Sequence, residues 1–255
     1  MSALYLIMIF GVVVMITHFL EGITGFGCTV LAMPFSIMLL GLGTAKPVLS
    51  IYALILAAYI AIRYYKSISF KDFWKIILFT LIGLPIGIVL YDVLLKKADT
   101  QKWLLIILAV FMVAVSIRGL LINFNILKRK NPIKNPLAYF FVFLGGIIHG
   151  AFASGGPLVT IYATEKIKDK SVFRATLCLV WSTLNTILII QMIAEKQIDM
   201  NIIKTALYAG PFFIAGLLLG DYSHKHIKDT VFTKLVFLVL LGSGIAMLVQ
   251  NFVKL

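Results

Sequence analysis

The chain has 255 residues, of which 61% are hydrophobic and only 13% are charged, and its formal net charge is +13. A soluble domain of this length needs a wettable exterior and carries about 25% charged residues, so the composition excludes an ordinary cytosolic enzyme, a disordered protein and a small disulfide scaffold. In a soluble protein the excess of cations would point to nucleic acid, but here the cations lie in short runs between apolar stretches. The composition therefore predicts a polytopic membrane protein that lies in the lipid bilayer and binds no nucleic acid.

Apolar stretches follow one another along the chain, and most are long enough to cross a bilayer as helices, which takes about 20 residues. The first has no Lys or Arg before it, so we expect it to stay in the membrane rather than to be cleaved as a signal peptide. The neighbours 137–149 and 156–164 are too short for two crossings and form either one long bent helix or two half-helices that meet inside the membrane. The stretches lie at about 1–20, 26–42, 47–62, 73–95, 103–124, 137–149, 156–164, 173–194, 202–220 and 231–252.

A glycine-rich break occurs in each half of the chain, at 21–27 and at 150–157. When the two halves of the sequence are aligned so that Gly22 matches Gly150, the two breaks coincide. The fourth apolar stretch of the first half and its counterpart in the second half also contain several glycines and a proline. Paired interruptions of this kind in two halves of a chain are a pointer to the binding site of a transporter.

The fold class predicted from these patterns is an all-α polytopic membrane protein with two inverted repeats, 1–127 and 137–255, joined by a basic linker at 128–136. Each repeat comprises a glycine-broken hairpin, re-entrant or built from half-helices, and three transmembrane helices. This layout divides the basic residues sixteen to seven between the two sides of the membrane, whereas four continuous spans per repeat would divide them twelve to eleven. The positive-inside rule favours the first layout, which places the linker in the cytoplasm and both termini outside. Whether the hairpins cross fully or turn back midway stays open.

Glu21 and His149 are the most informative titratable residues, because each lies at a glycine-rich break. An ionised group at membrane depth costs about 2.5–3.5 kcal/mol on insertion scales, so it is usually paired or faces a polar cavity. Histidine titrates near physiological pH and a buried glutamate can be shifted toward it, so both residues are candidates for exchanging a coupling proton. In the alternative reading, Glu21 lies at an interface and His149 only hydrogen-bonds a backbone carbonyl.

The breaks are also candidate anion sites, because the start of a helix exposes N–H groups that bind anions. Hydroxyl groups beside the glycines would add donors, and Asn185, in the middle of a span, is a further polar candidate. The alternative is that the small residues serve close helix packing. The predicted substrate-binding residues of the two breaks are Thr24, Gly25, Gly27, Ser154, Gly155 and Gly156.

Lys46 and Arg174 follow the first and the second hairpin at corresponding positions, and in the inverted layout they lie on opposite faces of the membrane. Each would draw an anion toward the centre from its own side, and an arginine can grip an oxyanion with two parallel hydrogen bonds. Alternatively, both are topology anchors whose heads reach the interface. The sequence contains no nucleotide-binding loop, metal motif or complete Ser–His pattern, so we expect neither a cofactor, a metal nor an enzyme activity.

Glycine-rich and proline-containing motifs follow one another at 22–27, 41–46, 83–87, 145–157, 174–176 and 210–220. Taken in order, these motifs resemble the TauE/SafE family of sulfite-exporter-like membrane permeases. The resemblance implies a transporter with two homologous halves, driven by protons or by the membrane potential, and a small substrate anion such as sulfite, sulfoacetate or a related organosulfur or carboxylate anion. The expected protein is an inner-membrane secondary transporter, an exporter that works by alternating access. A passive anion channel and a non-transporting membrane scaffold are the alternatives. The sequence leaves open whether the chain forms a homo-oligomer.

Overall fold

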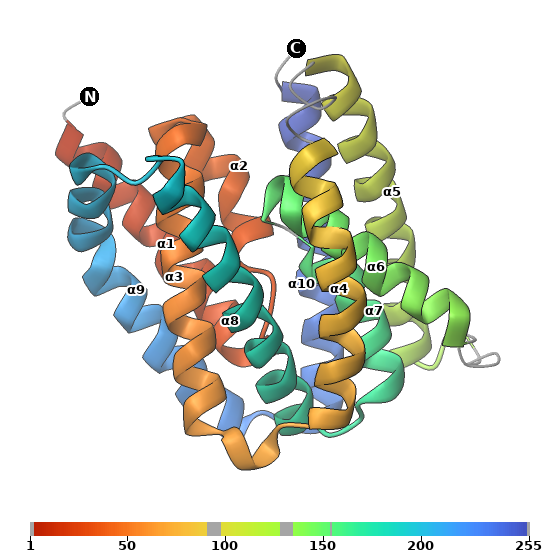
Figure 1. Ribbon diagram of the computed structural model, residues 1–255. Helices are drawn as coiled ribbons and strands as arrows, with labels where there is room; N and C mark the ends of the chain where they lie inside the picture. Colours follow the sequence, from red (N-terminus) through yellow and green to blue (C-terminus); the bar gives the residue numbers. More distant parts are fainter. Residues whose placement is uncertain (1–2, 91–97, 128–134, 154, 254–255) are drawn as a thin grey trace. The chain divides into compact units, whose positions relative to one another are not determined.

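The computed structural model describes residues 3–90, 98–127, 135–153 and 155–253, and within these ranges every regular element is a helix (Figure 1). Ten of the elements are α-helices and one is a short 3-10 helix. Their ends fall within a few residues of the predicted apolar stretches in most cases, because a long apolar run satisfies its backbone hydrogen bonds internally only as a helix. The all-helical prediction is confirmed.

The chain folds into two compact units, and each unit combines helices from both halves of the sequence. The first unit comprises Met1–Ile68 and Arg174–Ile227, and the second comprises Ser69–Phe173 and Lys228–Leu255. The first unit contains α1 (Ala3–Thr24), α2 (Cys28–Leu40), α3 (Leu42–Arg63), η1 (Tyr65–Ser67), most of α8 (Lys170–Ala194) and α9 (Met200–His226). The second contains α4 (Phe70–Leu90), α5 (Ala98–Asn123), α6 (Asn135–Phe152), α7 (Gly156–Lys166) and α10 (Asp229–Val253).

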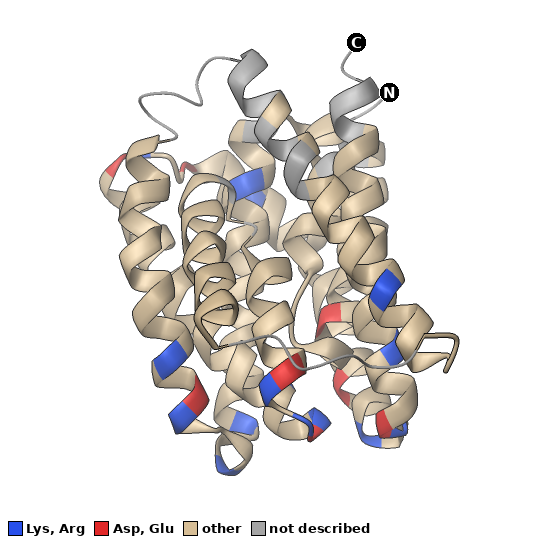
Figure 2. Ribbon diagram, turned by 90° about the vertical axis from the view of Figure 1, so that its right-hand side faces the viewer, with Lys and Arg blue, Asp and Glu red and all other residues tan. Residues whose placement is uncertain are grey.

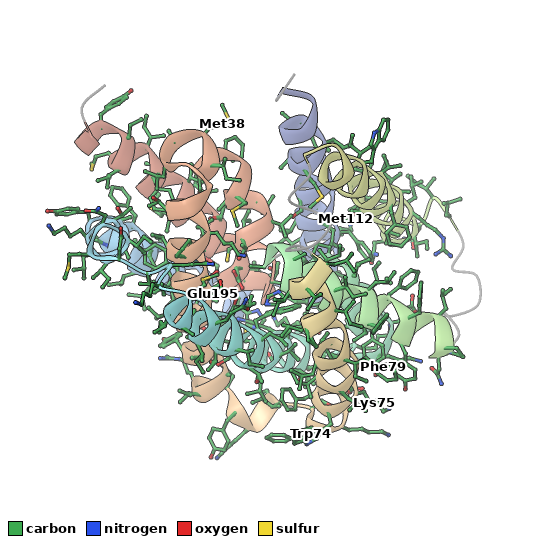
Figure 3. The ribbon with its side chains drawn as sticks, turned by 45° about the horizontal axis from the view of Figure 1, so that its top comes forward. Met38, Trp74, Lys75, Phe79, Met112 and Glu195 are labelled. Atoms are coloured by element: carbon green, nitrogen blue, oxygen red, sulfur yellow. The ribbon has the colours of Figure 1, made fainter. Side chains whose placement is uncertain are left out.

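Six of the described helices, α1, α3, α4, α8, α9 and α10, are long and apolar enough to cross a membrane. Figure 2 shows most charged residues near the ends of helices, with long uncharged stretches between them. The helices also expose apolar faces: on α4, Leu78, Ile82 and Val89 are all exposed, and Trp74 points outward near its start (Figure 3). A soluble protein rarely exposes such continuous apolar surface, whereas lipid covers it in a membrane. The protein is therefore a multi-pass membrane protein.

The stretch from 137 to 164 forms two separate helices, α6 and α7, rather than one bent helix. With 11 residues, α7 is about 16 Å long, and α2, with 13, is about 20 Å long, so neither alone spans a hydrocarbon core of about 30 Å. Each of these short helices packs against the longer helix before it, α1 for α2 and α6 for α7. The predicted linker, except for its last two residues, lies outside the described residues.

In the first unit, α1 and α9 approach so closely that their backbones touch. A Cβ atom built on Gly216 would lie 2.4 Å from the carbonyl oxygen of Met15, and one on Gly220 would lie 2.6 Å from that of Phe19. Only glycine permits this separation, so the small residues of α9 define the packing of the two helices.

In the second unit, α4 and α6 touch in the same way. A Cβ atom on Gly83 would lie 2.4 Å from the carbonyl oxygen of Phe143, and one on Gly87 would lie 2.0 Å from that of Ile147. The glycines that interrupt the fourth long stretch of each half therefore serve close packing, each against the helix that ends at a break.

Candidate functional site

The first break joins α1 to α2 through Gly25, Phe26 and Gly27. Gly25 and Gly27 have φ angles of 80° and 104°, a left-handed conformation that glycine adopts without steric cost. The hydroxyl of Thr24 lies 2.8 Å from the carbonyl oxygen of Leu20 and 3.0 Å from that of Phe26, so its hydrogen bonds hold the turn together. The predicted glycines thus let the chain reverse direction between a long and a short helix.

Glu21 lies in the last turn of α1 and is only 3% exposed. Its carboxylate accepts a hydrogen bond of 3.3 Å from the backbone N–H of Cys28, the first residue of α2. The positive end of a helix dipole and its free N–H groups favour negative charge at this place. The helix start that the sequence assigned to an anion therefore already holds a carboxylate of the protein.

One face of α8 lies against the first break. Arg174, Cys178, Trp181 and Asn185 recur at helical spacing on this face and are all buried. The indole N–H of Trp181 donates to the carbonyl oxygen of Gly25 at 3.0 Å. A Cβ atom on Gly25 would lie 3.0 Å from the Cα atom of Arg174. The structure thus brings two predicted residues, Gly25 and Arg174, into direct contact, with Asn185 on the same helix face.

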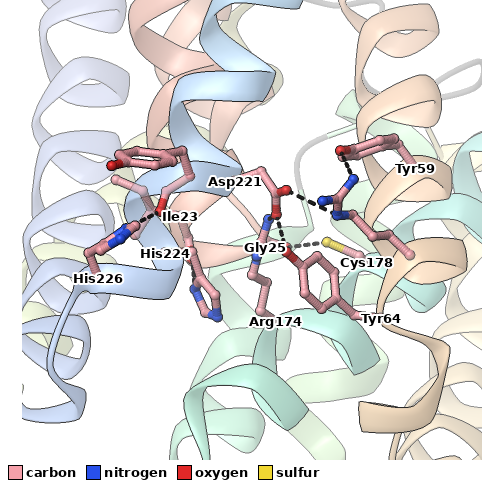
Figure 4. A network of polar contacts seen from close by, with 11 residues as sticks. Ile23, Gly25, Tyr59, Tyr64, Arg174, Cys178, Asp221, His224 and His226 are labelled. Atoms are coloured by element: carbon pink, nitrogen blue, oxygen red, sulfur yellow. Dashed lines mark hydrogen bonds and ion pairs between the residues drawn. The ribbon is translucent and has the colours of Figure 1, made fainter.

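Arg174 and Tyr64 converge on Asp221, a residue of α9 (Figure 4). The Nη2 atom of Arg174 and the hydroxyl of Tyr64 each donate to Oδ1 of Asp221 at 2.7 Å. Arg63 approaches from the other side, with Nε 3.4 Å from Oδ2. The guanidinium of Arg174 also lies over the Tyr64 ring, 5.0 Å from its centroid, as in a cation–π contact. Two arginines share one carboxylate, so these three ionised side chains carry one net positive charge.

Arg174 is 1% exposed, yet its Nε and Nη1 atoms have no hydrogen-bond partner among the described residues. Buried polar groups are almost always hydrogen-bonded, so each exception calls for an explanation. A guanidinium has five N–H donors in a planar fork that matches an oxyanion. The free donors of Arg174 are therefore a candidate contact for an anion.

His18 is a buried residue of α1 that the sequence reasoning missed. Its Nδ1 atom lies 2.8 Å from the carbonyl oxygen of Val14, and its ring meets the rings of Tyr52 and Phe213 edge-on. Its Nε2 atom has no partner in the described part of the chain. A histidine within an apolar span was itself a usable signal, one turn before Glu21. Asp221, at the end of an apolar stretch, was expected from the sequence to lie near a membrane interface, but it is buried within the first unit.

The second break belongs to the second unit and has a similar course. His149 lies in the last turn of α6 and is buried, and Ala153, just beyond the helix, has a φ angle of 52°. Gly155 precedes α7, which begins at Gly156, and a Cβ atom on Gly155 would lie 2.0 Å from the carbonyl oxygen of Gly145. Gly155 thus allows α7 to pack closely against α6. Ser154 lies outside the described residues.

The remaining polar candidates are less closely tied to a break. In α7, the hydroxyl of Thr160 is buried and has no partner among the described residues. Lys46 is partly exposed in the second turn of α3. The described residues hold no group of histidine, cysteine or acidic side chains that would bind a metal ion.

Together, the apolar spans, the broken helix pairs and the buried arginine define a polytopic helical membrane protein of the transporter class. The chain belongs to the sulfite exporter TauE/SafE family, whose model matches residues 9–247. Over 179 residues it is 23% identical to the "Probable inner membrane transporter protein TsaS" of Comamonas testosteroni, a match that covers 68% of this chain and 72% of that protein. No solved structure matches. The resemblance inferred from the motifs is confirmed, and the protein is a membrane transporter rather than an enzyme.

Proposed function

We propose that the protein is a secondary transporter in the inner membrane that exports a small anion, sulfite or a related organosulfur anion, by alternating access. The observation that carries this proposal is Arg174, a buried arginine beside a glycine break with two guanidinium nitrogens unpaired among the described residues. The description of the family, sulfite exporter, supports a sulfur oxyanion as substrate. Two oxygens of such an anion can accept hydrogen bonds from the fork of the guanidinium, and the net positive charge around Asp221 favours an anion there.

Each break is proposed to supply contacts for the anion. In the first unit, Thr24, Gly25 and Gly27 form the turn beside Arg174, and Asn185 lies further along the same face of α8. In the second unit, the corresponding residues of the second break are Ser154, Gly155 and Gly156. Lys46, a residue of the first unit, is proposed to attract the anion from the side of the membrane opposite to Arg174. Backbone N–H groups at the starts of α2 and α7 would complete the donors.

Recurring geometry supports two inverted repeats with the boundaries given by the sequence, 1–127 and 137–255. The residues Gly25 and Ala153, which the alignment of the breaks superposes, both have a positive φ angle. The N–H of Gly25 donates to the carbonyl oxygen of Glu21 at 2.6 Å, and the N–H of Ala153 donates to that of His149 at 2.7 Å. Two glycines four residues apart on α9 contact carbonyl groups of α1, and two glycines four residues apart on α4 contact carbonyl groups of α6 in the same order along the chain. The positive-inside rule then places both termini outside.

Glu21 and His149 are proposed to couple proton movement to anion transport. The carboxylate of Glu21 occupies the start of α2, the position that an anion would take. A proton on Glu21 removes this competing charge, so the protonated carrier would bind the anion better. Coupling to the membrane potential instead of protons would leave transport unchanged when both residues are replaced by neutral isosteres.

The test uses the full chain in proteoliposomes, with current and internal pH recorded while sulfite, thiosulfate, sulfoacetate or sulfate is applied to one side. We expect a protein-dependent signal for a sulfur anion, accompanied by proton movement. Arg174→Gln should lower the flux roughly ten- to a hundredfold, since a hydrogen bond to a charged group contributes about 1.5–3 kcal/mol. Arg118→Gln, at an exposed arginine of the second unit, is the matched control and should leave the flux unchanged.

Each alternative gives a different result in this assay. Flux that follows the anion gradient alone, with no concentrative uptake against it, would indicate a passive channel. No flux for any anion in folded protein would favour a scaffold. Wild-type flux in Arg174→Gln would refute the assignment of Arg174 to the binding site, although the protein would still be a transporter.

A further inference from the structure

We infer that Asp221 is a resident counter-anion for Arg174, which the transported anion displaces on binding. This inference rests on the proposed function, because it assumes that Arg174 receives the substrate. It assigns a role to a residue that the anion itself need not touch.

The contact between Asp221 and Arg174 leaves much of the guanidinium unused. Asp221 binds only Nη2 of Arg174, although the guanidinium has two further nitrogens, both unpaired among the described residues. A small oxyanion can accept two parallel hydrogen bonds from the fork, which makes a stronger contact than the present single one. An incoming anion therefore has more donors available on Arg174 than Asp221 takes.

Asp221 keeps other partners when the substrate anion breaks its contact with Arg174. The hydroxyl of Tyr64 donates to its Oδ1 at 2.7 Å, and Nε of Arg63 lies 3.4 Å from its Oδ2. Arg63 is itself held by the hydroxyl of Tyr59, to which it donates at 2.9 Å. The displaced carboxylate thus stays hydrogen-bonded and beside a positive charge, so its release does not leave a lone buried anion.

Burial makes this exchange necessary. Arg174 is 1% exposed and Asp221 is 4% exposed, and removing one partner of a buried ion pair leaves an uncompensated charge that strongly destabilises a protein. A carrier passes through states with and without its substrate. Asp221 balances the charge of Arg174 when the site is empty, and the anion balances it when the site is filled.

The pair is also placed to affect the first break. The backbone of Arg174 lies against Gly25, and one turn beyond Asp221 on α9 the Nδ1 atom of His224 lies 2.9 Å from the carbonyl oxygen of Ile23 (Figure 4). A change in the contact between Arg174 and Asp221 therefore acts on α8 and α9, which both touch the chain around the break.

The decisive variant is Asp221→Asn, which keeps the size of the side chain and an acceptor for Tyr64 but removes the charge. We expect the affinity for thiosulfate or sulfite, measured as the rise of the unfolding midpoint with anion concentration, to increase about tenfold. Net flux should fall at least fivefold relative to exchange of labelled anion, because the empty carrier then holds an unbalanced arginine. Asp229→Asn is the matched control: Asp229 is exposed, pairs with Lys170 in the second unit, and should change neither value.

The outcomes separate the inference from the proposed function. Wild-type affinity and a wild-type ratio of net flux to exchange in Asp221→Asn would overturn the inference, and if Arg174→Gln is inactive in the same assay, the proposed site still stands. Anion binding to Asp221→Asn but not to the wild type supports the inference. No binding to either overturns both. If Asp221→Asn does not fold, Asp221→Glu and Asp221→Gln are compared, which differ only in charge, and equal flux ratios would overturn the inference.

Discussion

Gly220→Ala is expected to destabilise the protein by separating α9 from α1. A Cβ atom at this position would lie 2.6 Å from the carbonyl oxygen of Phe19 and 2.8 Å from the Cα atom of Gly22. Both obstacles are backbone atoms, and Cβ atoms are essentially never found closer than 3.0 Å to another atom. The two helices would therefore have to move apart by several tenths of an ångström along a contact that only glycine allows.

The magnitude follows from two opposing effects. Overpacking costs about 1–3 kcal/mol, and we take the upper half of this range because backbone atoms cannot rotate away. Alanine also forms helix better than glycine by about 1 kcal/mol. The net loss for Gly220→Ala is then about 1–2 kcal/mol, which lowers the unfolding midpoint by roughly 2–4 °C per kcal/mol in a chain of this size.

The assay compares the unfolding midpoints of purified variants in one detergent. Gly43→Ala is the control, because no atom lies within 4 Å of a Cβ atom built on this helical glycine, and its midpoint should stay equal or rise slightly. Gly87→Ala makes the equivalent test in the second unit, where a Cβ atom would lie 2.0 Å from the carbonyl oxygen of Ile147. A midpoint of Gly220→Ala at or above that of Gly43→Ala would refute the reasoning from backbone contact.

Two further predictions concern local backbone geometry. Gly25→Ala should lower the stability by about 1–2 kcal/mol, because φ is 80° there and the new Cβ atom would lie 3.0 Å from Arg174. Ala153→Gly should raise the unfolding midpoint, because it relieves a similar strain at a φ angle of 52°. We expect opposite shifts in the same thermal assay, and a loss of stability in Ala153→Gly would contradict this reasoning. Asp199→Ala should cost about 1 kcal/mol, because its side chain accepts a hydrogen bond of 2.9 Å from the N–H of Ile202 and caps α9. That loss should appear in the thermal assay with anion flux unchanged, and a large loss of flux would mean that the start of α9 has more than a capping role.

The helices were predictable because a bilayer demands long apolar runs, and these are visible in the sequence directly. The break at Gly25 was predictable for the same kind of reason, since glycine marks a chain reversal. The conformation of Ala153 was not, because alanine carries no preference for a positive φ angle and only the alignment with the first break points to it. The division into two units was also hidden, because close helix contacts join α1 to α9 and α4 to α6, each across the two halves of the chain.

The candidate site was only partly predictable. Arg174 stood out as a cation that follows the second hairpin, whereas the structure places it against Gly25 of the first break. Its partner Asp221 lies on another helix, 47 positions further along the chain, and no periodicity within one helix links the two. The contacts of His18 and Tyr64 were hidden for the same reason: they depend on how helices pack, which composition and spacing do not determine.

Two features of the first unit that favour negative charge are each matched by a carboxylate of the protein. Glu21 accepts from the N–H at the start of α2, and Asp221 accepts from Arg174. A helix start or a buried arginine without a counter-charge would be costly in a low-dielectric interior, so both need an acid while no substrate is bound. Under the proposed function the two acids make room for the substrate differently: a proton neutralises Glu21, whereas Asp221 keeps its charge and stays in contact with Tyr64 and Arg63. Replacing Glu21 by glutamine should therefore weaken the dependence of anion flux on the proton gradient, whereas Asp221→Asn should alter the balance of net flux and exchange and leave that dependence in place.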